Sequence, residues 1–78
     1  MKTTKYFDYT RNRSDRLKIK EEWIIYVMEN PEKIEIQSDG RIRKWAKIEE
    51  TFKYLRVIIL EDGETVHNAF FDRSFKEG

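Results

Sequence analysis

The chain is 78 residues long, enough for one small hydrophobic core, so residues 1–78 are expected to form a single domain. It has no cysteine and one histidine, which excludes disulfides, thiol catalysis and multi-histidine zinc sites; we expect neither a metal nor another cofactor. No apolar run approaches the roughly 20 residues of a membrane span, and the N-terminus lacks the apolar stretch of a signal peptide, so we expect no membrane partner and a cytoplasmic location.

Charge is distributed unevenly, although the net charge is only +1. Residues 1–20 carry seven basic and two acidic side chains, and residues 41–60 carry six basic and two acidic ones. The two remaining blocks are acidic. Folding could bring the two basic blocks together, and an ordinary solvated surface is the alternative interpretation.

The first 30 residues predict mainly helix. Tyr6 to Thr10 alternates enough to indicate a short edge strand, and the basic segment 11–18 fits either a helical turn or a loop. From Lys20 to Glu29 the apolar residues share one broad face at the helical period. This helix is expected to end at Asn30-Pro31, because the residue before proline disfavours the α conformation.

After Pro31 the apolar period changes from 3.6 to 2, which indicates strands. They are expected near residues 34–36, 41–48, 54–60 and 64–71, separated by turns at Ser38-Asp39-Gly40, Glu49–Phe52 and Asp62-Gly63. The sequence therefore predicts an α+β fold. An N-terminal helical segment packs on one face of an antiparallel sheet of about four strands.

Turn lengths predict which side chains share a face. A two-residue turn at Asp62-Gly63 would give the core pairs Ile59–Val66, Val57–Asn68 and Leu55–Phe70. A four-residue connection would pair Ile48 with Lys53. In the first hairpin an even loop would turn Ile34 and Ile36 to the wrong side, so an odd loop or a bulge is expected.

The helix-free face of the sheet is then expected to carry cations beside aromatic rings. Arginine and lysine contact phosphates, and aromatic rings stack on unpaired bases, so this mixture suits RNA; a solvated or partner-covered face is the alternative. The residues expected on this face are Arg43, Trp45, Lys47, Tyr54, Arg56, His67 and Phe71.

His67 is the one side chain whose unperturbed pKa lies near neutrality. It could act as a general acid or base, with Arg56 stabilising phosphorane-like charge and Tyr54 orienting a 2′-hydroxyl. The alternative is a half-buried strand histidine packed against Ile58. Asp72-Arg73 fits an exposed ion pair or a strand-end cap, or else Arg73 binds phosphate.

The order of several short segments resembles a protein family. A basic N-terminal segment and a helix ending in Asn30-Pro31 precede Gly40-Arg41-Ile42-Arg43, Tyr54-Leu55-Arg56-Val57-Ile58 and Phe70-Phe71-Asp72-Arg73. This order is similar to that of small bacterial and archaeal domains related to the BrnT toxins and, more distantly, to the RelE/ParE toxin superfamily. The resemblance covers roughly residues 6–73.

The resemblance implies one half of a type II toxin–antitoxin pair, with an antitoxin protein as partner. RelE-like members cleave RNA through its 2′-hydroxyl without a metal, whereas ParE-like members inhibit gyrase. The positions that match are Arg43, Arg56 and Asp72-Arg73. Many relatives place a histidine near the start of the first helix, where this chain reads Asp8-Tyr9-Thr10-Arg11.

The leading hypothesis is thus a toxin-like, metal-independent ribonuclease. Its catalytic residues would be His67, Arg56 and Tyr54, and its RNA-binding residues Arg43, Trp45, Lys47 and Arg73. The alternative is a non-catalytic module of the same fold that binds a protein or a nucleic acid.

Overall fold

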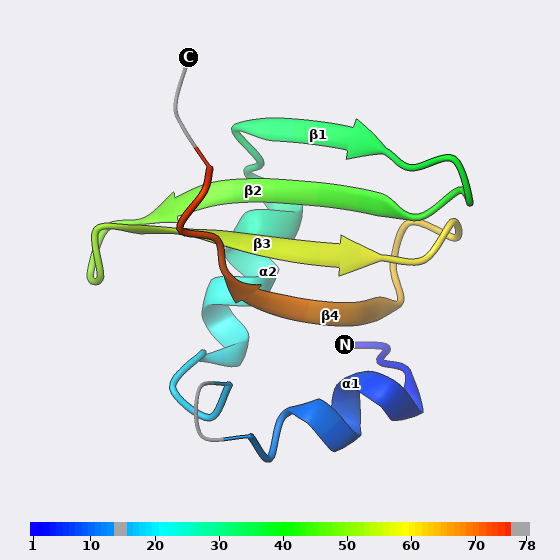
Figure 1. Ribbon diagram of the computed structural model, residues 1–78, viewed down its shortest axis with the longest axis horizontal. Helices are drawn as coiled ribbons and strands as arrows, with labels where there is room; N and C mark the ends of the chain where they lie inside the picture. Colours follow the sequence, from blue (N-terminus) through cyan, green and yellow to red (C-terminus); the bar gives the residue numbers. More distant parts are fainter. Residues whose placement is uncertain (14–15, 76–78) are drawn as a thin grey trace.

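Four antiparallel strands form one sheet in the order β1-β2-β3-β4, with two helices packed against it (Figure 1). The computed structural model describes residues 1–13 and 16–75. The elements are α1 (Lys5–Thr10), α2 (Glu21–Glu29), β1 (Lys33–Ile36), β2 (Ile42–Ile48), β3 (Lys53–Ile59) and β4 (Val66–Phe71). The predicted α+β class is confirmed. Within the described part of the chain, neither helix has the length and apolar character needed to cross a membrane.

The segment Lys5–Thr10 is helix α1, so the prediction of an edge strand at Tyr6 to Thr10 was wrong. Thr4 caps the helix by accepting a hydrogen bond from the Phe7 N–H at 3.1 Å, and Phe7 and Thr10, three residues apart, are both buried. The residues before α1 take the place beside β4 instead. The Val66 backbone donates to the Lys2 carbonyl at 2.9 Å and accepts from the Thr4 N–H at 3.0 Å.

Helix α2 lies behind the sheet and covers one of its faces (Figure 1). It buries Ile24 and Val27 against β2 and β3, and it ends before Pro31 as predicted. Its Trp23 donates an indole hydrogen bond to Glu50 in the β2–β3 connection at 2.8 Å. The buried core comprises Phe7, Ile19, Ile24, Val27, Ala46, Ile48, Leu55, Val57, Ile59, Val66 and Ala69.

The register of β3 against β4 differs from the prediction. The pair Ile59–Val66 is confirmed, but a bulge follows, and Val57 pairs with Ala69 rather than with Asn68. A bulge places one extra residue in one strand, so every later β4 side chain changes face. Ala69 and Phe71 therefore pack on the core side.

The other two hairpins follow the predicted pairing. Ile48 pairs with Lys53, and Ile36 pairs with Ile42 across an odd loop of residues 37–41. Ile34 and Ile36 thus face the helix side, yet they remain 55% and 72% exposed because α2 does not extend over β1.

The face opposite α2 carries no helix, as predicted, but it is not fully open. Residues after β4 turn back across this face in front of β3 and β2 (Figure 1). As a result Trp45, expected to be available on this face, is only 4% exposed.

Candidate nucleic-acid interface

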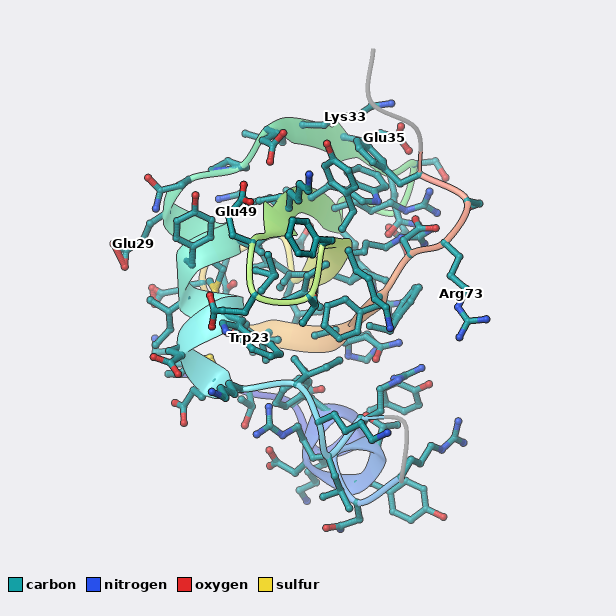
Figure 2. All side chains as sticks on the ribbon, turned by 90° about the vertical axis from the view of Figure 1, so that its left-hand side faces the viewer. Trp23, Glu29, Lys33, Glu35, Glu49 and Arg73 are labelled. Atoms are coloured by element: carbon teal, nitrogen blue, oxygen red, sulfur yellow. The ribbon has the colours of Figure 1, made fainter. Side chains whose placement is uncertain are left out.

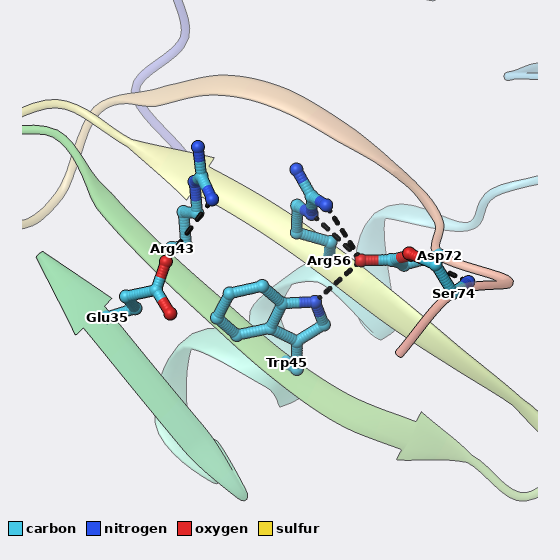
Figure 3. Close-up of polar contacts among 6 residues, drawn as sticks. All are labelled: Glu35, Arg43, Trp45, Arg56, Asp72 and Ser74. Carbon is cyan, nitrogen blue, oxygen red and sulfur yellow. Dashed lines mark hydrogen bonds and ion pairs between the residues drawn. The ribbon is translucent and has the colours of Figure 1, made fainter. Parts of the chain in front are cut away.

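Asp72 is the centre of a buried hydrogen-bond network on the face that α2 leaves uncovered. Its Oδ2 accepts from Trp45 Nε1 at 3.0 Å and from Arg56 Nε and Nη2 at 3.1 and 2.8 Å (Figure 3). Its Oδ1 accepts from the Ser74 N–H and hydroxyl at 3.0 and 2.7 Å. Burial raises the pKa of Asp72, but the hydrogen bonds from Ser74, Trp45 and Arg56 outweigh burial and hold it well below 3.8. The carboxyl is therefore ionised at neutral pH.

This network fixes residues 72–75 across the sheet. The Phe75 ring lies on Trp45 and Tyr54, with ring centroids 5.4 and 4.6 Å apart. The Arg56 guanidinium also lies over the Phe70 ring, 4.8 Å from its centroid. Arg56 and Trp45 consequently hold the C-terminal segment in place, and a phosphate or a base would have to displace Asp72 or Phe75 to reach them.

His67 lies at the edge of β4 against α1. Its Nδ1 is 3.1 Å from the Thr4 hydroxyl, and its ring stacks on Tyr6 with centroids 4.9 Å apart. Burial lowers the pKa of His67, and the nearby Arg41 lowers it further, with Asp39 acting in the opposite direction. The environment is that of a partly buried histidine that attaches a helix to a strand.

The structure does not bring the three expected catalytic residues together. His67 lies beside the Ile58–Ile59 bulge, whereas Tyr54 is four to five residues away along β3, which is about 13–17 Å at about 3.3 Å per residue. Groups that transfer protons with one phosphodiester must lie within hydrogen-bond reach of it, about 2.6–3.2 Å. Because Arg56 is also bound to Asp72, this trio cannot act on a single bond in this arrangement.

The four expected RNA-binding residues are only partly together. Arg43, Trp45 and Lys47 share one face of β2, as predicted. The Arg43 guanidinium, however, is paired with Glu35 on β1 at 3.2 Å, and Trp45 is covered (Figure 3). Arg73 lies elsewhere, beyond the end of β4, and extends away from the ribbon (Figure 2).

A basic cavity of about 390 Å³ lies at the end of the sheet where β4 finishes. It collects cations from three segments of the chain, and among the described residues no carboxylate lines it. The two basic sequence blocks do therefore meet in space. The lining residues are Arg16, Lys18, Lys53, Phe70, Phe71 and Arg73.

A second cavity of about 370 Å³ shares Lys53, Phe71 and Arg73 with the first. Its remaining walls are mostly aromatic, and its one carboxylate belongs to Asp72, which Arg56 already neutralises. We call the two adjoining cavities the basic–aromatic groove. The second cavity is lined by Phe52, Lys53, Tyr54, Phe71, Asp72, Arg73 and Phe75.

Phe52, at one end of this groove, has an unusual backbone conformation. Its φ of 56° is the left-handed region that favours glycine, and its side chain is 77% exposed. Lys47 lies over the ring, 5.5 Å from its centroid. A bulky residue at such a φ is costly, so the exposed ring suggests a role in contacting a ligand.

Sequence reasoning selected Arg73 and Tyr54, which line this groove, as site residues, but it missed Lys18 and Phe52. The signals were the basic charge of residues 1–20 and an aromatic residue inside a predicted turn. Only the fold shows that these segments lie at the same end of the sheet. Within residues 1–13 and 16–75, no group of three or more histidine, aspartate or glutamate side chains is arranged to hold a metal ion.

No protein-family model, curated protein or solved structure matches this chain.

Proposed function

We propose that this domain binds single-stranded RNA in the basic–aromatic groove. The observation that carries the proposal is the junction of the two cavities at Lys53, Phe71 and Arg73. Phosphates would lie in the basic cavity, which four cationic side chains line. An unpaired base would enter the adjoining cavity and stack on its aromatic rings.

The charge of the groove favours a polyanion over a neutral ligand. The first cavity, of about 390 Å³, is lined by Arg16, Lys18, Lys53 and Arg73, and a concave surface lined by cations attracts a polyanion. A single strand fits better than a duplex, because the bases of a duplex are stacked on each other and cannot lie on a protein ring.

Phe52 supplies the second part of the argument. Its strained backbone brings an exposed ring to the mouth of the aromatic cavity, where it can stack on a base. Glycine adopts the same backbone conformation without strain, so Phe52→Gly removes the ring and leaves the turn intact.

The proposal is tested by fluorescence anisotropy with a labelled single-stranded oligoribonucleotide at low and moderate salt. Arg73→Ala should weaken binding several-fold and reduce the salt dependence by about one counterion. Phe52→Gly should weaken binding by about five-fold or more, since one stacked base contributes about 1–3 kcal/mol. The same RNA annealed into a duplex should bind less well.

Lys5→Ala is the matched control, because this exposed lysine at the start of α1 does not line the groove. If Lys5→Ala weakens binding as much as Arg73→Ala does, the attraction is diffuse and the groove is not the site. Absence of RNA binding at low salt would refute the proposal outright.

The resemblance to toxin ribonucleases leads to a further expectation, that bound RNA is cleaved and that an antitoxin protein covers the site. Of the three residues expected to be catalytic, Tyr54 is the one that lines the groove. Gel analysis of the RNA recovered from the binding experiment tests cleavage separately. Intact RNA would leave binding as the function, and defined fragments would extend it to catalysis.

A further inference from the structure

One edge of the sheet is covered by other parts of the chain, and the other edge is exposed. The β4 edge is covered by residues 2–4, which make backbone hydrogen bonds to Val66, and by α1, which packs against β4. The β1 edge has no neighbouring strand in the described chain, and all four residues of Lys33–Ile36 are exposed (Figure 1). An exposed strand edge with two large apolar side chains is a template for another strand.

The backbone of β1 presents a definite set of free groups. The Gln37 N–H bonds the Arg41 carbonyl at 2.8 Å, which identifies the odd-numbered residues of this strand as those paired with β2. Hydrogen-bonding direction alternates along an antiparallel strand. The N–H and C=O groups of Ile34 and Ile36 therefore point outward along the plane of the sheet.

The charges of β1 are complementary to those of a second copy of the same strand. If two antiparallel copies are centred on Ile34, Lys33 of each lies opposite Glu35 of the other. The neighbouring register, centred on Glu35, would place two glutamates directly opposite each other, which is unfavourable. The register centred on Glu35 would pair the outward groups of Ile34 with those of Ile36, whereas the register centred on Ile34 pairs the two Ile34 residues with each other. The charge pairs favour the register centred on Ile34.

The apolar side chains favour the same register. Ile34 meets its own copy at the two-fold axis, and Ile36 lies diagonally across from Ile34 of the second copy. Four isoleucines, 55% and 72% exposed in the single chain, would then cover one another on the α2 side. Self-complementarity of this kind is what a two-fold interface requires.

We propose that two copies of this chain pair antiparallel through β1, centred on Ile34, to form one continuous eight-stranded sheet. The interface lies on the opposite edge of the sheet from α1 and outside the residues that line the groove. Its existence is therefore independent of RNA binding.

Disulfide cross-linking tests the register, because the natural chain has no cysteine. In Ile34→Cys the two α-carbons would be about 5.5 Å apart, within the range of a disulfide, and mild oxidation should give a covalent dimer. In the matched control Ile36→Cys the two cysteines would be four residues apart along the strands, about 13 Å, and should not link. Efficient linking of Ile36→Cys but not Ile34→Cys would overturn the proposed register.

Charge-reversal variants test the pairing itself, with the monomer–dimer equilibrium measured by sedimentation velocity over a range of concentrations. The wild type should dimerise, whereas Lys33→Glu alone and Glu35→Lys alone should each be monomeric because like charges meet twice. An equimolar mixture of the two variants should dimerise again, since each altered residue then faces its opposite charge.

Thermal unfolding shows whether each variant is folded, since Lys33 also lies over Trp45 and Glu35 pairs with Arg43. Each variant lacks its own internal contact both alone and in the mixture. Recovery of dimerisation in the mixture therefore reports the charge pairs between copies and not those internal contacts. A wild type that stays monomeric at every concentration overturns the proposal. So does a mixture that fails to associate while its components are folded and the wild type dimerises.

Discussion

The carboxylate of Asp72 accepts five hydrogen bonds from three residues, and it links two strands to the C-terminal segment. Asp72→Asn keeps the shape of the side chain but removes its charge. It also places an amide NH₂, itself a donor, where one carboxylate oxygen accepted hydrogen bonds. We expect this variant to lower the free energy of unfolding by about 2–3 kcal/mol, because hydrogen bonds to a charged group are the stronger kind. Urea unfolding followed by tryptophan fluorescence measures it.

The matched control is an exposed ion pair between Lys2 and Glu64, whose side chains are 70% and 53% exposed. Glu64→Gln should leave the free energy of unfolding nearly unchanged, since solvent screens such a pair. An effect of Asp72→Asn that is equally small would mean that the network contributes little to stability.

Sequence reasoning at the scale of single residues identified Asp72-Arg73 as a feature but not the partner of the aspartate. An ion pair between neighbours or a strand-end cap was the local interpretation. Arg56, sixteen residues earlier in the chain, is the partner of Asp72, and Arg73 instead lines the groove. Such a choice depends on the register of two strands and on how the chain turns after β4, neither of which composition reveals.

The sequence predicted the bounds of an element well where its pattern of apolar residues is long. Helix α2 and strands β2 and β3 appear close to the expected bounds because six or more residues repeat the same pattern. Residues 6–10 were too few to distinguish a helix from a strand, and the N-cap at Thr4 with burial of Phe7 decides for α1. The β4 bulge could not be predicted either, because a bulge adds one residue to a strand without a turn signal in the sequence.

Helix α1 is held to the sheet in part by His67, and this attachment can be tested directly. His67→Ala removes the ring stacked on Tyr6 and the contact with the Thr4 hydroxyl. Each contact contributes about 0.5–1.5 kcal/mol, so the amides of α1 should exchange with solvent about tenfold faster at neutral pH, as measured by NMR.

Tyr9→Ala serves as the control for α1, because Tyr9 lies on the same helix and is 72% exposed. In Tyr9→Ala the backbone amides of α1 should exchange with solvent at nearly the wild-type rate. Equal exchange in His67→Ala and the wild type would show that buried Phe7 and Thr10 alone hold the helix.

The sheet has one face under α2 and a second face partly under residues 72–75, and its β1 edge has no neighbouring strand among the described residues. The basic–aromatic groove forms where the β4 end, the β2–β3 connection and the segment before α2 converge. From its cations and rings the sequence predicted an RNA-binding surface on the middle of the sheet, where residues 72–75 lie instead. The C-terminal segment that occupies that position was the unpredictable part.

Stability of the whole molecule should fall in two separate steps as pH is lowered. His67 has a pKa below 6.5 in the folded chain, so the unfolded chain binds the proton more readily, and stability is lost as pH falls through about 6.5. The pKa of Asp62 is lowered to about 2 by hydrogen bonds from Thr65 and Glu64, and the pKa of Asp72 is also lowered. Their contribution is full above about 4 and is lost as pH falls from there toward 2.

Urea unfolding midpoints measured from pH 8 to pH 2 would resolve the two steps. His67→Ala should remove the step near pH 6.5 and leave the acid step unchanged, because His67 is the one side chain whose unperturbed pKa lies in that interval. Asp72→Asn should flatten the acid step, leaving the part due to Asp62. A midpoint that is constant between pH 8 and pH 5 in the wild type would contradict the first assignment. An acid step as steep in Asp72→Asn as in the wild type would contradict the second, since it would mean that the buried carboxylate does not couple protonation to folding.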